Sequence, residues 1–488
     1  MISDKKNSIF LGLNGNPNYF GIDRYLSPSE YYPEYPFSRE ELSKSNSIYK
    51  VVREGFFKLG YDLENYNTSK WNPLSAFIKE GDTVLIKPNW VMHKNKNKNN
   101  PNDLECLVTN PSIVRALLDY TLIALKGTGK VILADAPMQG CDLDALFKIT
   151  GYDKLFEFYR KQGIEIAVLD LRAERVITSS RVITETIEVN NDDQSVCIDL
   201  GDFSRHINPG KLYKVSDYSA SKTNTYHQQN KHVYNISRIA IEADVIINLP
   251  KPKCHRLAGI TAAQKNLVGI IFDKSSLPHR AIGSKQEGGD EYLTKSPIKT
   301  LYTRLEEKKL ELTSSNKSGK ALALQFLIGL IYLWVRFFSK DKVMIGSWYG
   351  NDTIWRTVTD LNFIVKYADK NGIIQNTSQR KIFNVADMII AGQGNGPIGP
   401  HPKPLGIILM GEDPVFMDAM CARIMGFGIS KIPGMNDALA NDKLSVEGEK
   451  IVLSTEPEFN NISFGSFRGK PEWRFNPHDF WKGHIEEQ

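Results

Sequence analysis

The sequence predicts an α/β fold that is layered, with a mainly parallel sheet and flanking helices, plus an antiparallel excursion and an inserted apolar helix. Short apolar runs alternate with helical patterns over residues 82–175, which is typical of βαβ units. The same alternation returns over residues 380–433. The chain of 488 residues is 41% hydrophobic and 24% charged, so it can bury a core, and wholesale disorder, collagen and coiled coil are excluded.

The first elements follow a polar start. Residues 1–38 are rich in Tyr, Pro and Asn and show neither a helical nor a strand period, so we expect an ordered N-terminal arm. A helix is predicted over residues 39–59. The apolar run at 82–90 predicts a buried parallel strand that delivers Lys87 and Asn89 into a loop. Residues 94–100 are polar and of low complexity, which predicts a mobile surface loop.

The next segment carries a strong helix signal. Asn110 followed by Pro111 predicts a capped helix that ends near Leu125. Residues 130–135 and 164–170 predict strands, the first of which ends in Asp135, and residues 143–160 predict a helix between them. Short alternating patterns over 177–217, with a hairpin turn expected at 190–193, predict the antiparallel excursion. The main sheet is predicted to resume at residues 243–249.

An unusual apolar run begins at Ala321 and ends at Phe338. It follows a charged helix predicted over residues 304–311, and it has roughly the 20 residues that a bilayer span requires. Cationic residues flank the run at positions 317, 320, 336, 340 and 342, which suits anionic lipid. Three interpretations stay open: a buried helix, a helix that lies in the membrane interface, and a true span.

The last third predicts a second α/β part. Strands are predicted at 380–390 and 405–410, and Asp413 followed by Pro414 predicts the start of a helix. The Gly- and Pro-rich loop at 392–404 is followed by a strand, whereas a dinucleotide-binding fingerprint requires a helix there. We divide the chain into an arm (1–38), an α/β core (39–300), an inserted helical segment (301–345), a second α/β part that completes the core (346–440) and a C-terminal tail (441–488).

Charge and cysteine content narrow the class of protein. Lys and Arg number 61 against 56 Asp and Glu, a net charge of +5, so we expect no nucleic-acid partner. Five cysteines stand far apart without a Cys-x-x-Cys pair, which argues against a disulfide framework, a zinc ribbon and an iron–sulfur cluster. The first residues resemble no secretory signal. We therefore expect a cytoplasmic protein, with peripheral attachment to the inner membrane face as a further option.

A candidate site follows the strand at 243–249, because ligands of open α/β sheets bind beyond the carboxyl ends of the strands. Four side chains with basic groups lie there in one proline-stiffened loop: Lys251, Lys253, His255 and Arg256. A helix predicted from Thr261 presents Lys265 and Asn266 on its first turns. Ammonium, guanidinium and helix N–H groups favour phosphate or carboxylate, so the sequence predicts an anion-binding site. A solvated cationic loop is the alternative.

Further polar residues are expected at the same edge of the sheet. His279 and Arg280 stand further along the chain, and Lys87, Asn89 and Asp135 end earlier strands. Imidazole groups can ligate a metal, carry protons or cap a helix. Each of these residues also has a purely structural interpretation.

These motifs resemble a widespread prokaryotic family called domain of unknown function number 362. The matching blocks run from residue 82 to residue 433 and include Lys87-Pro-Asn-Trp, residues 243–255, residues 261–269, Gly394-Asn-Gly-Pro and residues 411–419. The family's usual Lys-x-Lys-Thr-His becomes Lys251-Pro-Lys-Cys-His here, so Cys254 replaces a hydroxyl. Some relatives carry a ferredoxin-like module with cysteine repeats; this chain has no such repeats, so the resemblance implies no electron transfer.

A more distant similarity is to the lactate racemase family, whose nickel-pincer nucleotide is attached to a lysine and flanked by histidines. By that resemblance Lys265 corresponds to the cofactor-linking or anion-binding lysine, and His255 and His279 correspond to metal ligands or acid/base groups. The double glycine of that family is absent here.

Two functions of different classes remain. The first is an isomerase- or racemase-like enzyme that acts on an anionic small molecule, such as a phosphorylated or carboxylated sugar or a hydroxy acid, with a divalent metal or covalently bound cofactor as an option. Its expected catalytic residues are His255, His279 and Lys265, and the two histidines are also the expected metal ligands. Its expected anion-binding residues are Lys251, Lys253, Arg256, Asn266, Arg280, Lys87, Asn89 and Asp135. The second is a non-catalytic ligand-binding accessory protein of an envelope or glycan pathway, which docks on a membrane surface through the run from Ala321 to Phe338.

Overall fold

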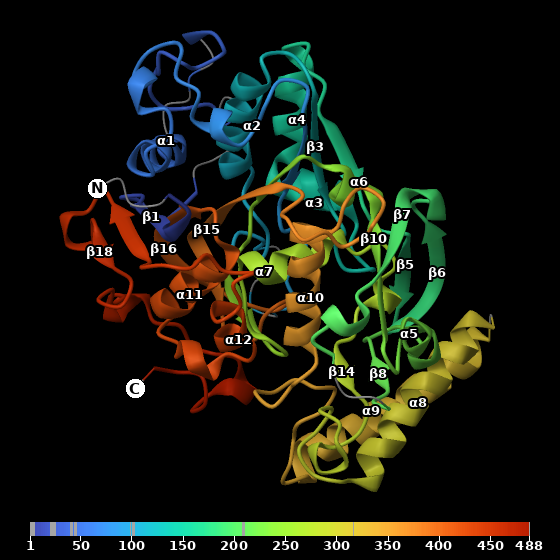
Figure 1. Cartoon of the computed structure of the whole chain (residues 1–488). Helices are drawn as coiled ribbons and strands as arrows, with labels where there is room; N and C mark the ends of the chain where they lie inside the picture. The colour runs from blue at the N-terminus through green and yellow to red at the C-terminus, as the bar shows by residue number, and fades with distance from the viewer. Residues whose placement is uncertain are drawn as a thin grey trace.

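The computed structural model describes residues 5–19, 26–39, 42, 46–97, 99, 103–206, 210–315 and 317–487. The described part is organised around one 11-stranded sheet (Figure 1). Its strands follow the order β18, β17, β1, β16, β15, β11, β2, β3 and β4, and β12 and β13 join beside β15. The bounds of these strands are β1 Ser8–Leu13, β2 Thr83–Lys87, β3 Lys130–Asp135, β4 Ala167–Asp170, β11 Val245–Asn248, β12 Lys253–His255, β13 Gly259–Thr261, β15 Lys381–Gln393, β16 His401–Gly411, β17 Ile451–Ser454 and β18 Ile462–Ser463.

The middle of the sheet is parallel. Strands β4, β3, β2, β11 and β15 are joined by parallel ladders, whereas β16 pairs antiparallel with both β15 and β1. Val245 of β11 lies opposite Val84 of β2 on one side and opposite Lys381 of β15 on the other. Residues 82–175 and 380–433 therefore share one sheet, and the predicted α/β class is confirmed.

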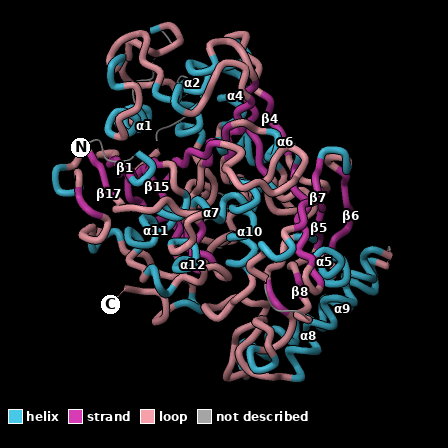
Figure 2. The backbone as a smooth tube through the Cα atoms, in the orientation of Figure 1, coloured by secondary structure: helices cyan, strands magenta, loops and turns pink. Residues whose placement is uncertain are grey.

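Helices cover both faces of the sheet (Figures 1 and 2). The alternation along β11 shows how: Val245 and Ile247 belong to one core cluster and Ile246 to another, as expected for a strand buried on both faces. The first cluster includes residues of α1 (Ile48–Lys58), α2 (Pro111–Leu125) and α4 (Tyr152–Lys161). The second includes residues of α7 (Ala263–Asn266), α10 (Ile354–Tyr367), α11 (Pro414–Met425) and α12 (Met435–Leu439).

Several predicted elements form with the expected caps. The Asn110 side chain accepts a hydrogen bond from the backbone N–H of Ser112 at 3.0 Å at the start of α2. Asp413 does the same for Val415 at 2.8 Å and Phe416 at 3.0 Å at the start of α11. Both helices have proline at their first position, so the combination of capping residue and proline predicts their starts correctly.

Two helix predictions are corrected. The helix predicted over residues 39–59 begins at Ile48 among the described residues, and positions 40–41 and 43–45 lie outside them. The helix predicted over residues 143–160 is divided into α3 (Leu143–Thr150) and α4. Gly151 between them has φ 83°, the left-handed conformation that ends a helix at glycine.

The antiparallel excursion forms, but its hairpin turn is not at residues 190–193. Strands β5 (Glu174–Ser179) and β6 (Val182–Glu188) are joined by Ser180 and Arg181, which both have positive φ. A second small sheet contains β7 (Ser195–Asp199), β10 (Lys231–Ser237) and β9 (His227–Gln228), and β8 (Tyr213–Lys214) pairs with β14 (Arg280–Ala281). The short helices α5 (Ala220–Tyr226) and α6 (Arg238–Glu242) lie in the same region of the chain.

Both ends of the chain add strands to the main sheet. Strand β1 lies between β16 and β17, and its residue Leu11 is fully buried opposite Leu409. The expectation of an arm without strand structure is therefore wrong for Ser8–Leu13. The surface-loop prediction for residues 94–100 agrees with the exposure of Lys94, Lys96 and Asn99, but not with the burial of Asn95. Asn95 is buried and donates to the Pro400 carbonyl at 3.1 Å, while residues 98 and 100 lie outside the described residues.

The inserted segment forms a helical hairpin. Helix α8 (Pro297–Ser314) is followed after a short turn by α9 (Ser318–Phe338), and the two helices pack side by side. The hairpin lies at the margin of the molecule, at the lower right of Figure 1. The apolar run therefore stands outside the two core clusters that flank the sheet.

A buried ion pair joins two strands at the edge where the site is predicted. Lys87 Nζ at the end of β2 lies 2.7 Å from Asp135 Oδ1 at the end of β3, and neither side chain is more than 3% exposed. Asp135 Oδ2 also accepts from the backbone N–H of Trp90 at 2.7 Å. Gly269 fits against the pair because a Cβ atom there would lie 1.9 Å from Asp135 Oδ1. The two charged groups thus neutralise each other inside the protein.

We predict that Lys87→Met lowers the free energy of unfolding by about 3–5 kcal/mol, because the Asp135 carboxylate remains buried without its cation. The double variant Lys87→Met/Asp135→Leu should recover part of this loss. Urea unfolding followed by circular dichroism measures both. Lys126→Met, which removes an exposed ion pair with Glu80, is the matched control and should cost less than about 1 kcal/mol. Equal stability of the Lys87 and Lys126 variants would contradict the structural role of the buried pair.

Candidate functional site

Asparagine side chains form a network at the carboxyl ends of β2 and β11. Asn248 at the end of β11 donates to Asn384 of β15 at 2.9 Å. Asn266 donates to Asn248 at 2.8 Å and accepts from Asn89 at 2.9 Å. Because each amide group both donates and accepts hydrogen bonds, this network holds the side chains of Asn89 and Asn266 in fixed orientations.

Two lysines of the predicted cationic loop are engaged in the interior. Lys251 Nζ lies 3.0 Å from Asp387 Oδ2, with both side chains fully buried, and it also bonds to the Tyr19 hydroxyl. Lys253 Nζ donates to Asn89 Oδ1 at 2.5 Å and to the Leu107 carbonyl at 2.6 Å. Burial, with the positive charge of Lys251, lowers the pKa of Lys253 to about 7. These two lysines hold the loop in place.

Four other basic side chains lie within electrostatic reach of one another: His255, Arg256, Lys265 and His279, which we call the cationic cluster. Burial lowers the pKa of both histidines, and the charges of Lys265 and Arg256 lower it further. Burial and the charge of Arg280 likewise lower the pKa of Arg256. In the part of the chain that the structure describes, Lys87, Lys251 and Arg280 form ion pairs with carboxylates, but none of the four members of the cationic cluster does.

The two imidazoles of the cluster are held in different tautomers. His255 Nδ1 accepts backbone N–H groups of Leu257 and Ala258, both at 3.1 Å, so the proton of the neutral ring is on Nε2. His279 Nδ1 lies 2.9 Å from the Leu277 carbonyl and must donate to it, which leaves Nε2 with a lone pair. One ring thus offers a donor and the other an acceptor at neutral pH.

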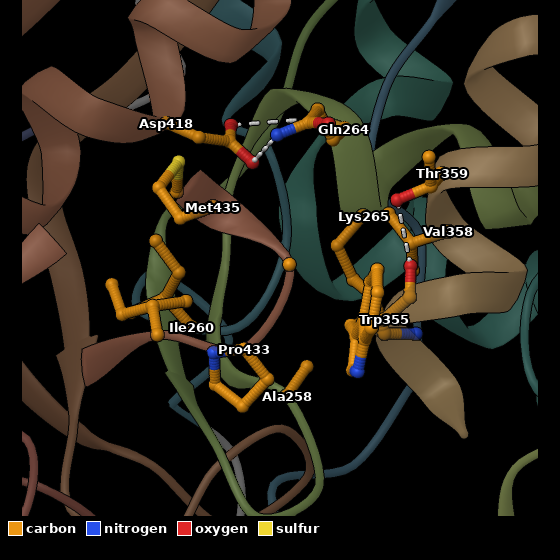
Figure 3. A pocket seen from close by; sticks show the side chains of 12 residues that line it. Ala258, Ile260, Gln264, Lys265, Trp355, Val358, Thr359, Asp418, Pro433 and Met435 are labelled. Carbon is orange, nitrogen blue, oxygen red and sulfur yellow. Dashed lines mark hydrogen bonds between the residues drawn. The ribbon is translucent and has the colours of Figure 1, made fainter. Parts of the chain in front are cut away.

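A small cavity of about 40 Å³ adjoins Lys265 (Figure 3). Lys265 and Trp355 lie on one side of it, and Ile260, Pro433 and Met435 lie on the other. The volume suits a few water molecules or a small head group rather than a whole sugar.

Gln264 and Asp418 close one end of this cavity (Figure 3). The Asp418 carboxyl group accepts the backbone N–H of Gln264 at 3.3 Å and its side-chain amide at 3.2 Å. Burial raises the pKa of Asp418 to about 7, although these hydrogen bonds oppose the shift. Burial alone lowers the pKa of Lys265 to about 8. A carboxyl and an amine that both titrate near neutral pH are suited to proton transfer.

The structure divides the residues predicted from the sequence into two groups. It brings together His255, Arg256, Lys265 and His279. The others are bound to protein groups: Lys87 to Asp135, Lys251 to Asp387, Lys253 to Asn89, Asn266 to Asn248, and Arg280 to Glu291 at 2.8 Å. A larger hollow of about 770 Å³ beside α3 and α4 contains none of the predicted site residues.

The local structure around Lys265 also differs from the prediction. Residues 259–261 form β13, and the helix expected from Thr261 is the single turn α7 (Ala263–Asn266). Lys265 therefore lies in a single helical turn and not on the first turns of a long helix. Sequence reasoning missed Gln264, Trp355 and Asp418. Gln264 and Asp418 lie within the quoted motifs at 261–269 and 411–419, so their position there was the available signal.

The surroundings of the histidines favour an anion over a metal ion. The described residues contain no group of three or more His, Cys, Asp or Glu side chains placed to hold a metal. His255 and His279 lie close to Lys265 and Arg256, whose positive charges repel a cation. The metal-binding role of the two histidines therefore stays a prediction from the sequence.

Three further histidines form a separate buried group. His206, His227 and His232 have ring centroids 5.5–6.0 Å apart. His227 Nε2 lies 2.9 Å from the Ser276 carbonyl, and burial lowers the pKa of this ring to about 3. These neutral rings pack as part of the interior.

Comparisons with known proteins place the chain in a sequence family. A family model described as "Domain of unknown function (DUF362)" matches residues 84–206 and 182–423. A thylakoid-associated protein of Synechocystis sp. is 26% identical over 201 residues, which is 41% of this chain and 43% of that protein. The chain thus matches less than half the length of this relative. The alignment with a crystal structure of a protein from Thermotoga maritima covers 80% of this chain and 60% of that protein's chain, with 12% sequence identity and a TM-score of 0.28.

The raised pKa of Asp418 predicts a pH-dependent stability. In the unfolded chain this carboxyl loses its proton near pH 4, whereas the folded protein retains the proton up to about pH 7. Between these values the folded state binds more protons, so the contribution of Asp418 to stability falls as pH rises. In the wild type this effect lowers the free energy of unfolding by up to about 4 kcal/mol between pH 4 and pH 7.5. We expect Asp418→Asn to abolish this pH-dependent decrease. Unfolding measured across this range tests it, and parallel pH profiles of the variant and the wild type would contradict it.

The lowered pKa of Lys265 predicts unusual reactivity. Only the neutral amine reacts with acetic anhydride, so labelling of Lys265 should follow a titration near pH 8, whereas an ordinary exposed lysine titrates near 10.4. Competitive isotope labelling with peptide mass spectrometry measures both in one sample, with exposed Lys126 as the internal control. A Lys265 profile that coincides with that of Lys126 would contradict the burial of the amine.

Proposed function

Because the chain belongs to the DUF362 family, whose description assigns no activity, we propose its function from the site: an enzyme that binds an anionic small molecule at the cationic cluster and moves a proton on it. The substrate class is a phosphorylated or carboxylated sugar or a hydroxy acid. The observation that carries the proposal is the gathering of His255, Arg256, Lys265 and His279 without a carboxylate partner among the described residues.

Charge balance supports the binding of an anion. Positive groups that are brought together and partly removed from water raise the free energy of the folded protein. Nearby lysines avoid this cost through ion pairs with Asp135 and Asp387, whereas the members of the cluster form no ion pair among the described residues and Asp217 acts on Arg256 only at longer range. A phosphate or carboxylate group would supply the missing charge and accept hydrogen bonds from guanidinium and ammonium groups.

Proton transfer is the chemistry that the titratable groups support. Lys265 and Asp418 titrate close to neutral pH, and His279 offers a lone pair at Nε2 while His255 offers an N–H. One group would remove a proton from a carbon next to the carboxylate or carbonyl of the substrate, and another would return a proton to the opposite face. The net reaction is an isomerisation or epimerisation, and it needs no oxidant.

The roles of the other predicted residues follow from their partners. Arg256 and Lys265 would hold the anionic group. Lys253, Asn89 and Asn266 would hold the loop of residues 251–256 in position through the hydrogen bonds described above. They would not contact the reacting atoms. A covalently attached cofactor would require a neutral amine, and among the cluster residues Lys265 is the amine with a suitably lowered pKa.

Hydrogen exchange with solvent tests the proposal. We expect the protein to catalyse incorporation of deuterium from D₂O at the carbon next to the acid or carbonyl group of a member of a panel of 2-hydroxy acids and sugar phosphates. Asp418→Asn and Lys265→Met should lower the exchange rate at least about 100-fold, the usual contribution of general acid–base catalysis, while Lys126→Met keeps the wild-type rate. Proton NMR measures the rate.

Calorimetry with inorganic phosphate separates binding from catalysis. Saturable binding that weakens in Lys265→Met but not in Lys126→Met supports the cluster as the anion site. Phosphate binding without exchange on any member of the panel would contradict the enzyme and favour the non-catalytic ligand-binding alternative. Absence of both would overturn the proposal.

A further inference from the structure

Helix α9 has one buried seam and one exposed apolar face. Ala321, Ile328, Ile331 and Val335 are buried, and Ile331 and Val335 pack with Met344 and with side chains of α8. Most of the remaining large apolar side chains are exposed, with Phe326, Phe337 and Phe338 at 70% or more, and Leu324 is half-buried. We call the exposed set the α9 apolar face; its members are Leu322, Phe326, Leu327, Leu330, Leu333, Trp334, Phe337 and Phe338. The interpretation of a buried helix is therefore wrong.

The exposed side chains form one continuous stripe. At 100° per residue they occupy a sector of roughly 160° on the helix, and the buried residues occupy the opposite side. Soluble proteins rarely leave so continuous an apolar stripe in water unless it binds something. Figure 1 shows why a partner can reach it: α9 lies in the hairpin at the margin of the molecule.

The hairpin itself argues against a span. Helix α9 is long and apolar enough to cross a bilayer by length and composition. However, α8 packs along it and would enter the bilayer with it, and α8 carries Arg304, Glu307 and Lys308 among other charged residues. The base of the hairpin is closed by Lys299 and Asp341 at 2.7 Å, so both helices leave and rejoin the body at the same place. Charged α8 cannot lie in hydrocarbon at acceptable cost.

We propose that α9 lies flat in the interface of an anionic membrane, with the α9 apolar face in the acyl chains and α8 on the aqueous side. The charges at its ends match such a surface: Lys317 and Lys320 precede or begin the helix, and Arg336, Lys340 and Lys342 end or follow it, all of them exposed. Helix α9 contains no Asp or Glu. An apolar face with Trp and Phe, bordered by cations, is typical of interfacial helices.

The same charges disfavour a second copy of this chain as the occupant. Antiparallel pairing of two α9 helices would set the cations at the start of one helix against those at the end of the other. Parallel pairing would set each group against itself. Neither arrangement supplies an acidic partner, whereas anionic lipid does.

Docking would also hold the cationic cluster close to the membrane. Tyr302 of α8 and Tyr332 of α9 influence the pKa of Arg256, so its guanidinium group lies within electrostatic reach of the hairpin. The membrane inference does not depend on the proposed catalytic function, because it rests on the hairpin of α8 and α9 and the cations that flank it.

Vesicle flotation with the full chain tests the inference. We expect binding to vesicles of phosphatidylglycerol mixed with phosphatidylcholine, weaker binding to phosphatidylcholine alone, and release by high salt. The triple variant Phe326→Ser/Leu330→Ser/Phe337→Ser should bind at least about tenfold more weakly. The matched control is Leu212→Ser/Ile373→Ser, which changes residues that are 59% and 60% exposed elsewhere and should bind like the wild type.

The fluorescence of Trp334 provides a second measurement, which reports how deeply α9 enters the bilayer. Its fluorescence should shift to the blue on anionic vesicles and be quenched more by lipids brominated near the head group than by lipids brominated at the chain end. Equal vesicle binding by the triple variant and the wild type would overturn the inference. So would resistance to alkaline carbonate extraction, which indicates a span, or a stable dimer in solution that loses its association only in the triple variant and does not bind vesicles.

Discussion

The parallel pairing of β11 with β2 on one side and β15 on the other is the constraint on which the rest of the structure depends. It joins two segments of chain that are far apart in sequence into one sheet. It also brings the ends of β2 and β11 to the same edge, next to Asn384 within β15, where Asn248 bonds to Asn384 and Asn266. Because parallel strands all point the same way, whatever follows each strand must meet there. The site is a consequence of this register.

Carboxylates then decide which basic residues at this edge are structural. Lys87 and Lys251 each form an ion pair with a buried aspartate. Separating such a buried pair is strongly destabilising, so these lysines are structural. Lys253 has carbonyl acceptors instead of a carboxylate, and burial together with the charge of Lys251 lowers its pKa to about 7. Among the described residues, the members of the cationic cluster form no ion pair, and one of them, Lys265, lines the cavity. The distribution of the acids, rather than that of the lysines, therefore defines the candidate site.

The elements that could be predicted from the sequence are those fixed by neighbouring residues. Helix α2 starts where Asn110 and Pro111 specify it, and α11 starts at Asp413 and Pro414 for the same reason. Strand β1 could not be found in this way, because its edges are completed by β16 and β17 from the other end of the chain. The hairpin turn between β5 and β6 was missed since Ser180 and Arg181, which adopt positive φ there, are not typical residues for that conformation.

The sequence locates the candidate site at this edge of the sheet but does not show the partners of its residues, and the reason is physical. A run of basic residues after a buried strand locates an edge of the sheet, yet each charge acquires its role from a partner that the sequence does not show beside it. Asp387 and Asp135 come from other strands, and Asp418 comes from α11, where it reaches Gln264 across the fold. For α9, composition alone allowed three environments: buried, interfacial and spanning. The exposure of its apolar face, the charged neighbour α8 and the closed base of the hairpin are what favour the interface. In both places the decisive information is the charge that packing places next to a residue.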